Sequence, residues 1–303
     1  MKISRHLSVF LLAAATLAGG EQDYVESFDS LYNSLTVEKR GTVVELRARS
    51  RGRQALESAV DLGDPLKLVV NYTRTLYAAL FFQPKPERVL MIGLGGAGFH
   101  RLFAAAYPQS LLQTVELDPQ VLELCRTHLG FQPTAQTPVA LMDGRMFVKR
   151  DTGKWDWLIL DAFRGGFVPP HLKTEEFYRE CAARLSERGV FVSNLHSGNE
   201  LYFSDLKTIC AVFPQVVLFA TANSGNVIAF AVNYRKPVVT DPANWPPVAE
   251  LQQSAMTGRL DLAAIRRERT DWPQAEIDRA QLLTDDFAPV EFLNTVKANN
   301  TVK

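Results

Sequence analysis

The sequence predicts an α/β protein in which a mainly parallel sheet is covered by helices on both faces. Three observations lead to this prediction. Beyond residue 88, short apolar runs alternate with segments of helical periodicity. The first run, 89–92, leads directly into a glycine-rich turn. Acidic residues follow three of the runs, at Glu116, Asp143 and Asp161, and ligands bind beyond such strand ends in sheets of this kind.

The order of the elements specifies the sheet further. Five apolar runs are separated by helical segments and therefore predict parallel strands, which need long crossover connections. The last two runs are joined only by a polar turn at Asn223, so they should form an antiparallel hairpin. This order is typical of a Rossmann-like, seven-stranded sheet of the methyltransferase type. The predicted strands are 89–92, 111–115, 139–142, 155–160, 189–194, 215–220 and 226–232.

The segment before this sheet has a different pattern. A hairpin is predicted over 35–48, with its turn at Lys39-Arg40-Gly41, and a third strand over 52–61 completes a small β module. Asp64-Pro65 then supplies an N-cap followed by proline at the first helical position. Apolar residues recur at helical spacing after it, so a helix is predicted from 64 to 82.

The two ends of the chain are separate regions. Lys2 and Arg5 precede the apolar stretch 7–17, which is the pattern of a secretory signal peptide. Beyond residue 236 the chain is rich in proline and then helical, with helices expected at 249–255 and 261–269, and it should pack on the sheet or close over the site. The four predicted regions are a signal peptide at 1–20, a β module at 21–63, a Rossmann-like nucleoside-binding domain at 64–235 and a C-terminal helical appendage at 236–303.

Composition limits the partners and the compartment. With 33 basic and 33 acidic residues the formal net charge is zero, so no nucleic-acid partner is expected. A genuine signal would make the protein exported or periplasmic, without stable membrane insertion after its removal; otherwise it is cytoplasmic. Three widely spaced cysteines, Cys125, Cys181 and Cys210, argue against a disulfide framework and a zinc site. Buried free thiols fit a reducing compartment and therefore favour the cytoplasmic alternative.

The glycine-rich turn and the acid after the next strand predict a nucleoside-type ligand. Glycines let the backbone approach a ligand closely, and Glu116 can accept hydrogen bonds from ribose hydroxyls. His171 and His196 lie in loops near the expected site, although a lone histidine is more often a loop residue than a catalyst. The glycines of the turn are Gly93, Gly95, Gly96 and Gly98.

Several of these motifs together resemble the spermidine synthase family, the polyamine aminopropyltransferases, in its divergent bacterial branch. The resemblance extends over roughly 24–292 and includes the glycine-rich turn, Val115-Glu116-Leu117-Asp118-Pro119, Met142-Asp143-Gly144 and the Leu283–Glu291 segment. It implies binding of decarboxylated S-adenosylmethionine and transfer of its aminopropyl group to a small-molecule amine acceptor. It implies no metal, and a homodimer is a further expectation.

The resemblance also implies roles for individual residues. Glu116 corresponds to the ribose-binding acid, and Asp143, with Gly144 beside it, to the residue that holds the adenine amino group. Asp161 corresponds to the catalytic aspartate that helps deprotonate the attacking amine. Tyr72 corresponds to a tyrosine of the acceptor pocket.

The acceptor half departs from the family pattern. Family members carry an aspartate in the glycine-rich turn, where this chain has Gly96, and Arg164 replaces the second aspartate after the fourth strand. Arg74 stands where a glutamate is usual. Arginines would repel a polyamine, which needs carboxylates to replace its lost water. Asp285, Asp286 and Glu291 could return negative charge from the C-terminal segment.

Three functions therefore remain open from the sequence. The first is aminopropyl transfer with Asp161 as the base. The second is a methyltransferase that uses S-adenosylmethionine itself, in which Arg74 or Arg164 would bind the carboxylate that the decarboxylated form lacks. The third is a non-catalytic, nucleoside-binding relative of the family.

Overall fold

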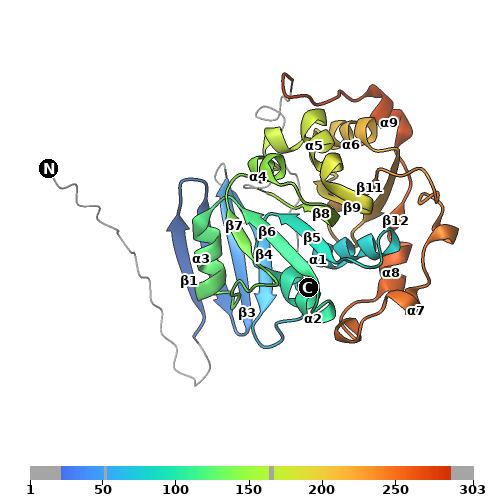
Figure 1. Cartoon of the computed structure of the whole chain (residues 1–303). Coiled ribbons are helices and arrows are strands. Elements are labelled where there is room, and N and C mark those ends of the chain that lie inside the picture. The colour runs from blue at the N-terminus through green and yellow to red at the C-terminus, as the bar shows by residue number, and fades with distance from the viewer. Residues whose placement is uncertain (1–21, 51–52, 164–166, 288–303) are drawn as a thin grey trace.

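The computed structural model describes residues 22–50, 53–163 and 167–287, which form a large sheet covered by helices and a smaller sheet beside it (Figure 1). In the larger sheet β5, β6, β7, β8 and β9 pair in parallel, whereas β11 runs antiparallel to β9 and β10. The predicted fold class is therefore confirmed, with one short strand added at an edge. The order is β12 (Arg269–Thr270), β10 (Gln215–Ala220), β11 (Asn226–Val232), β9 (Leu185–His196), β8 (Trp155–Leu160), β5 (Arg88–Ile92), β6 (Leu111–Glu116) and β7 (Val139–Leu141).

Both faces of this sheet are buried, which explains why its strands are continuous apolar runs. Along β5, Val89 and Met91 belong to the core on one face, and Leu90 and Ile92 to the core on the other. The first face is covered by η1 (Leu76–Phe81), α2 (Gly98–Ala106) and α8 (Leu262–Arg267). The second is covered by α4 (Gly144–Arg150), α5 (Glu175–Arg184), α6 (Tyr202–Val212) and α9 (Gln274–Arg279).

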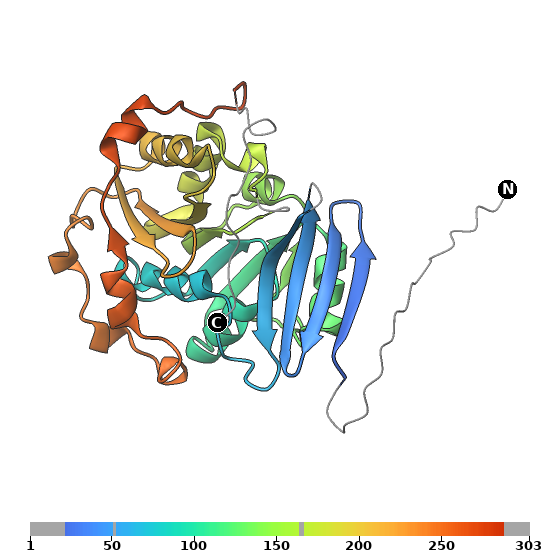
Figure 2. The same cartoon turned by 180° about the vertical axis from the view of Figure 1, so that it is seen from behind.

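The N-terminal module is a four-stranded antiparallel sheet, one strand larger than predicted. Its strands, in order, are β1 (Tyr24–Asp29), β2 (Ser34–Arg40), β3 (Val43–Ser50) and β4 (Arg53–Asp61). It packs on α3 (Pro119–Thr127) through a third apolar cluster that contains Val37, Leu46 and Leu124 (Figure 2). The β3–β4 register shifts by one residue, because Leu46 pairs with Ser58 and Arg47 with Leu56. Glu57 is therefore the extra residue of a β-bulge.

The predicted helix over 64–82 is wrong in its first half. The chain turns after Asp61, is not helical at Val69 and is extended at Val70, so helical structure begins only at α1 (Asn71–Thr75) and continues as η1. Val69 and Val70 are both buried. Two adjacent β-branched residues buried together suit an extended segment better than a helix, a preference that the apolar spacing concealed.

The C-terminal appendage runs from one face of the large sheet to the other and adds β12 at the edge (Figure 1). The helix predicted at 249–255 is only α7 (Val248–Leu251) followed by a 3₁₀ turn, η4 (Ser254–Met256). The second predicted helix corresponds to α8, and α9 was not predicted. The appendage packs on the sheet, and its residues 283–287 are attached to α4 and α5.

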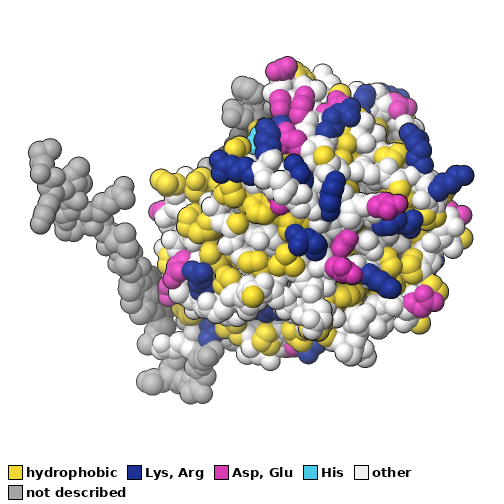
Figure 3. Space-filling model, viewed as in Figure 1, with side chains coloured by type: hydrophobic (Ala, Val, Ile, Leu, Met, Phe, Trp, Pro, Cys, Tyr) yellow, Lys and Arg dark blue, Asp and Glu magenta, His cyan; other side chains and the backbone are white. Residues whose placement is uncertain are grey.

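The surface carries no field of a single sign on the face shown in Figure 3, where Lys and Arg lie among Asp and Glu. None of the helices within 22–287 that the structure describes is long and apolar enough to cross a membrane. The three cysteines are free thiols, with Cys125 and Cys181 buried and Cys210 partly buried.

Candidate active site

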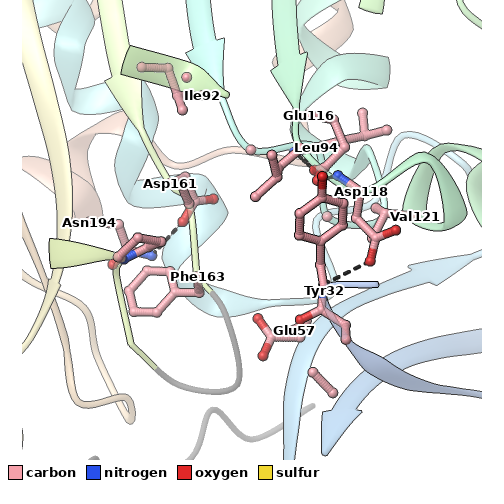
Figure 4. A pocket seen from close by; sticks show the side chains of 18 of the residues that line it. Tyr32, Glu57, Ile92, Leu94, Glu116, Asp118, Val121, Asp161, Phe163 and Asn194 are labelled. Carbon is pink, nitrogen blue, oxygen red and sulfur yellow. Dashed lines mark hydrogen bonds between the residues drawn. The ribbon is translucent and has the colours of Figure 1, made fainter. Parts of the chain in front are cut away.

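A cavity of about 140 Å³ lies at the carboxyl ends of the parallel strands, between the two sheets (Figure 4). Residues from both sheets line it, so neither sheet forms the site alone. The strand ends contribute Gly93, Glu116, Asp143, Asp161 and Asn194, and the N-terminal module contributes Tyr32, Asn33 and Glu57.

The glycine-rich turn forms the floor of the cavity. Gly93 has φ of +105°, and a Cβ atom there would lie 2.3 Å from the carbonyl oxygen of Asp161. Only glycine fits, because this turn packs directly against the end of β8. Gly93 and Gly95 line the cavity. Gly96 and Gly98, predicted as ligand-binding residues, are not among the lining residues, and Gly96 faces Ser58 of β4.

Glu116 stabilises the turn as well as facing the cavity. Its Oε2 accepts a hydrogen bond from the Leu94 N–H at 3.0 Å, and its Oε1 accepts one from the Asp118 N–H at 2.8 Å. Burial raises the pKa of the carboxyl, and these backbone donors oppose the rise. Each carboxylate oxygen retains a second lone pair, so both could also accept from ribose hydroxyls.

Asp118 connects the nucleoside end of the cavity to the N-terminal module. Its Oδ1 caps α3 by accepting from the Gln120 N–H. Its Oδ2 accepts from Ser30 Oγ at 2.6 Å and from Asn33 Nδ2 at 2.8 Å. These bonds hold the β1–β2 loop so that Tyr32 lies over the cavity beside Glu116 (Figure 4). Sequence reasoning missed Tyr32 and Asn33, whose contact with Asp118 spans more than eighty residues.

Asp143 is the N-cap of α4, and Gly144 follows it. Asp143 Oδ1 accepts from the Met146 N–H at 2.9 Å, and Oδ2 is 2.7 Å from His171 Nε2. The hydrogen bond from His171 lowers the pKa of this carboxyl. A Cβ at Gly144 would lie 2.4 Å from Ile92 Cγ2, so glycine lets α4 approach β5 closely. Both residues line the cavity, as does His171.

Asp161 directly follows β8 at the opposite end of the cavity. Its Oδ2 accepts from the Tyr72 hydroxyl at 3.0 Å, and its Oδ1 accepts from Asn194 Nδ2 at 2.8 Å. Loss of water around the carboxyl raises its pKa to about 6, while the hydrogen bonds from Asn194 and Tyr72 lower it. A carboxyl with such a pKa is ionised at neutral pH and still basic enough to accept a proton.

Two asparagines fix the orientation of that carboxylate. Asn226 Nδ2 donates to Asn194 Oδ1 at 2.8 Å, so the Asn194 amide must present its Nδ2 to Asp161. Both side chains are nearly fully buried, on the adjacent strands β11 and β9. His196, at the end of β9, lines the cavity next to them and accepts at Nδ1 from the Gly198 N–H.

Comparison with known proteins identifies the fold and the family. The spermine/spermidine synthase domain matches residues 71–230, which is more than half of the chain. A polyamine aminopropyltransferase of Vibrio vulnificus is 31% identical over 97% of this chain and 100% of its own. The chain belongs to the spermine/spermidine synthase family. It is therefore a transferase, as the sequence motifs predicted.

A further relative agrees with this membership, and two solved structures share the fold. A polyamine aminopropyltransferase of Chromobacterium violaceum is 32% identical over 61% of this chain and 72% of its own. A probable spermidine synthase from Corynebacterium glutamicum shares the fold, with a TM-score of 0.68, 22% identity and coverage of 88% of this chain and 98% of that one. A spermidine synthase solved with the transition-state analogue AdoDATO has a TM-score of 0.64, with 23% identity over 84% of this chain and 88% of that one.

Of the two arginines that depart from the family pattern, Arg74 lies away from the cavity. Arg74 does not line the cavity: its Nη2 forms an ion pair with Glu268 Oε1 at 2.6 Å, at the end of α8. Thr75 Oγ1 donates to the other oxygen of Glu268. Arg74 thus joins the appendage to α1 and is not placed to meet an acceptor. Arg164 lies outside the described residues.

Asp285 and Asp286 do not bring negative charge to the cavity, which the sequence had left open. Both carboxylate oxygens of Asp285 accept from Arg145, at 2.6 and 2.7 Å, and Oδ1 also accepts from Thr174 Oγ1. These bonds attach residues 283–287 to the outside of α4 and α5. Asp286 is exposed and does not line the cavity, and Glu291 lies outside the described residues.

The charge of the cavity wall is nevertheless strongly negative. Among the described residues, the lining contains no Lys or Arg. It contains carboxylates from both sheets, including Glu57, which the sequence did not single out. They are Glu57, Glu116, Asp118, Asp143 and Asp161. A wall of this kind suits a cationic ligand.

Proposed function

We propose that this protein transfers the aminopropyl group of decarboxylated S-adenosylmethionine to a small-molecule amine. The observation that carries the proposal is Asp161, which stands in a carboxylate-lined cavity with its orientation fixed by Tyr72 and Asn194. Decarboxylated S-adenosylmethionine is cationic at its sulfonium and its ammonium, and the acceptor is cationic until it loses a proton. The names of the relatives support this reaction class.

The nucleoside end fits the adenosyl part of this cosubstrate. Tyr32 offers an aromatic wall beside Glu116, and Asp143 lies where the next strand ends. Glu116 and Asp143 would accept hydrogen bonds from the ribose and from the adenine amino group, through lone pairs that their present donors leave free. The cosubstrate supplies an electrophilic methylene bonded to sulfur and a neutral thioether as the leaving group.

At the other end, Asp161 acts as a general base. One of its oxygens takes a proton from the acceptor ammonium or amine, and the freed nitrogen lone pair forms the new C–N bond as the C–S bond breaks and its electrons pass to sulfur. Tyr72 and Asn194 hold the carboxylate toward the attacking nitrogen. The transfer is a direct displacement, so proximity and orientation provide much of the rate acceleration.

The wall also favours the decarboxylated cosubstrate over S-adenosylmethionine itself. The α-carboxylate of the intact form would enter a cavity that has five carboxylates and, among the described residues, no Lys or Arg. An anion placed there would be repelled and would lack a cationic partner. Arg74, which could have bound that carboxylate, is paired with Glu268.

The test is product analysis with decarboxylated S-adenosylmethionine and putrescine, for the wild type and for Asp161→Asn. We expect an aminopropylated amine and methylthioadenosine in equal amounts, with turnover reduced roughly 100- to 10,000-fold in the variant. Calorimetry with intact S-adenosylmethionine should show weaker binding than with the decarboxylated form. Tighter binding of the intact form, with methylated products, would identify a methyltransferase instead.

We also propose that residues 1–20 act as a secretory signal, on the basis of their charged and apolar pattern. N-terminal sequencing of the protein from its native cells should find a mature chain that begins at Glu21. A chain that retains Met1 or Lys2 would contradict export.

A further inference from the structure

Glu57 occupies an unusual place in the cavity wall. It is the extra residue of the β-bulge in β4, because the pairing with β3 passes from Ser58 directly to Leu56. A bulge redirects the side chain of the extra residue and commonly occurs beside active sites. Here it places Glu57 in the lining together with its neighbours Leu56 and Ala55, and buries its Oε1. Figure 4 shows the carboxylate pointing into the cavity below Tyr32.

The next residue along β4, Ser58, packs against the glycine-rich turn. Ser58 Cβ lies 3.5 Å from the Cβ position of Gly95, and Ser58 Oγ lies 2.7 Å from that of Gly96. The turn itself contains no acidic residue, and a side chain at position 96 would collide with Ser58. Besides Glu116, which accepts from the Leu94 N–H of the turn, negative charge on this side of the cavity comes from Glu57 of β4, outside the large sheet.

The remaining four carboxylates of the wall serve the two ends of the cavity. Glu116, Asp118 and Asp143 accept backbone N–H groups at the nucleoside end. Asp161 is oriented by Tyr72 and Asn194 at the acceptor end. Glu57 lies near this second group. Burial is the main cause of the raised pKa of Tyr72, and the charges of Asp161 and Glu57 raise it further.

The cosubstrate of the proposed reaction carries an ammonium three carbons from its sulfonium. That ammonium must lie in the cavity between the turn and Asp161, and burying it requires a carboxylate partner. Asp161 is needed for the acceptor nitrogen. We propose that Glu57 binds the ammonium of the aminopropyl group and thereby selects the decarboxylated cosubstrate. This inference rests on the proposed function.

The test compares two nucleoside ligands, of which only the first carries this ammonium and a sulfonium charge. Calorimetry would measure the affinity of decarboxylated S-adenosylmethionine and of methylthioadenosine, which keeps the nucleoside and lacks the aminopropyl chain. We expect Glu57→Gln to weaken the first roughly 10- to 100-fold, the range for loss of a hydrogen-bonded charge, and to leave the second unchanged. Glu57→Asp, which keeps the charge, should lose less.

Glu45→Gln is the matched control, because Glu45 lies on β3 of the same sheet, pairs with Arg47 and does not line the cavity. It should change neither affinity. Equal weakening of both ligands by Glu57→Gln, or no weakening of the charged one, would overturn the role of Glu57 while leaving the proposed function intact. A rise in the KM for the acceptor alone in Glu57→Gln would also overturn this role. If the wild type binds neither ligand, the proposed function fails and this inference fails with it.

Discussion

The two ends of the cavity are built in different ways. At the nucleoside end, Glu116, Asp118 and Asp143 each accept hydrogen bonds from backbone N–H groups within three residues or in the neighbouring turn. At the amine end, Asp161 is held by Tyr72 from α1 and Asn194 from β9, and Glu57 comes from the other sheet. The carboxylates of the first end are therefore held mainly by backbone donors of turns and helix caps, although the loop that carries Tyr32 comes from the other sheet. The carboxylate of Asp161 at the second end is held by side chains from segments far apart in the sequence.

This difference explains why a family pattern can be kept at one end and altered at the other. The acids of the nucleoside end also bind backbone N–H groups of a turn and of helix caps. Substituting them would disturb the backbone, so few other residues are tolerated there. Carboxylates at the amine end can be delivered from any element that borders the cavity. The loss of an acid at Gly96 is compatible with a negative wall, because Glu57 stands on the adjacent strand.

The largest effect is expected for Gly93→Ala, since Gly93 joins the two ends. Its φ is +105°, and the new Cβ would meet the Asp161 carbonyl oxygen at 2.3 Å, so the turn and β8 must separate. We expect kcat/KM to fall roughly 100-fold or more, as for ångström-scale misplacement of reacting groups. Gly258→Ala is the control: it has φ of +74° but nothing within 4 Å, so it should lose stability and keep activity. Equal activity losses in both variants would contradict this reason.

The next effect concerns the amine end alone. With the pKa of Asp161 at about 6, kcat/KM should fall as pH decreases below about 6, because the base becomes protonated. Asn194→Leu removes a hydrogen bond that stabilises the charged form, so the acid limb should move up by roughly one pH unit. Asn226→Leu, which removes the hydrogen bond that orients Asn194, should move it less. Profiles of kcat/KM against pH for the three proteins would test this, and an unmoved limb would remove Asn194 from the mechanism.

A smaller effect should be confined to the nucleoside end. Asp143→Asn keeps a cap for α4, since asparagine also caps helices, but weakens acceptance from His171 and from an adenine amino group. We expect methylthioadenosine to bind roughly 10-fold more weakly, with the KM for the acceptor unchanged. Asp261→Asn changes the same kind of cap on α8, away from the cavity, and should leave binding unaltered. A rise in the acceptor KM would show that the two ends are not independent.

The smallest effect is expected for Arg74→Gln. Because Arg74 pairs with Glu268 outside the cavity and is about one-third exposed, its loss should lower the free energy of unfolding by about 1 kcal/mol or less. The KM for a polyamine acceptor should not change. Glu268→Gln should lower stability similarly, measured by urea denaturation. A large change in the acceptor KM for Arg74→Gln, without one for Glu268→Gln, would show that Arg74 contributes to acceptor binding.

The sequence predicted the parts of the molecule that depend on short-range pattern. The seven strands follow from apolar runs buried on both faces, and the positions of Glu116, Asp143 and Asp161 follow from where those runs end. The helix from 64 was predicted wrongly in its first half because Val69 and Val70 satisfy an apolar spacing while lying outside any helix.

The amine end could not be predicted in the same way. The place of Glu57 depends on a register shift between β3 and β4, which leaves no signature in the sequence of either strand. The pairing of Arg74 with Glu268 joins residues almost two hundred positions apart. At the nucleoside end, Tyr32 could not be predicted for the same reason: its loop docks on Asp118 from a distant part of the sequence, and a serine and an asparagine gave no specific signal.

Because the β1–β2 loop is bonded to Asp118, ligand binding at the large sheet should also affect the small sheet. One oxygen of Asp118 accepts hydrogen bonds from Ser30 and Asn33 and the other caps α3, two residues after Glu116 of the cavity wall. A nucleoside that tightens this turn will also tighten the β1–β2 loop, so amide hydrogens of β1 and β2 should exchange more slowly in its presence. A fragment that begins at residue 64 would lack one wall of the cavity, and with it the means to retain its ligand.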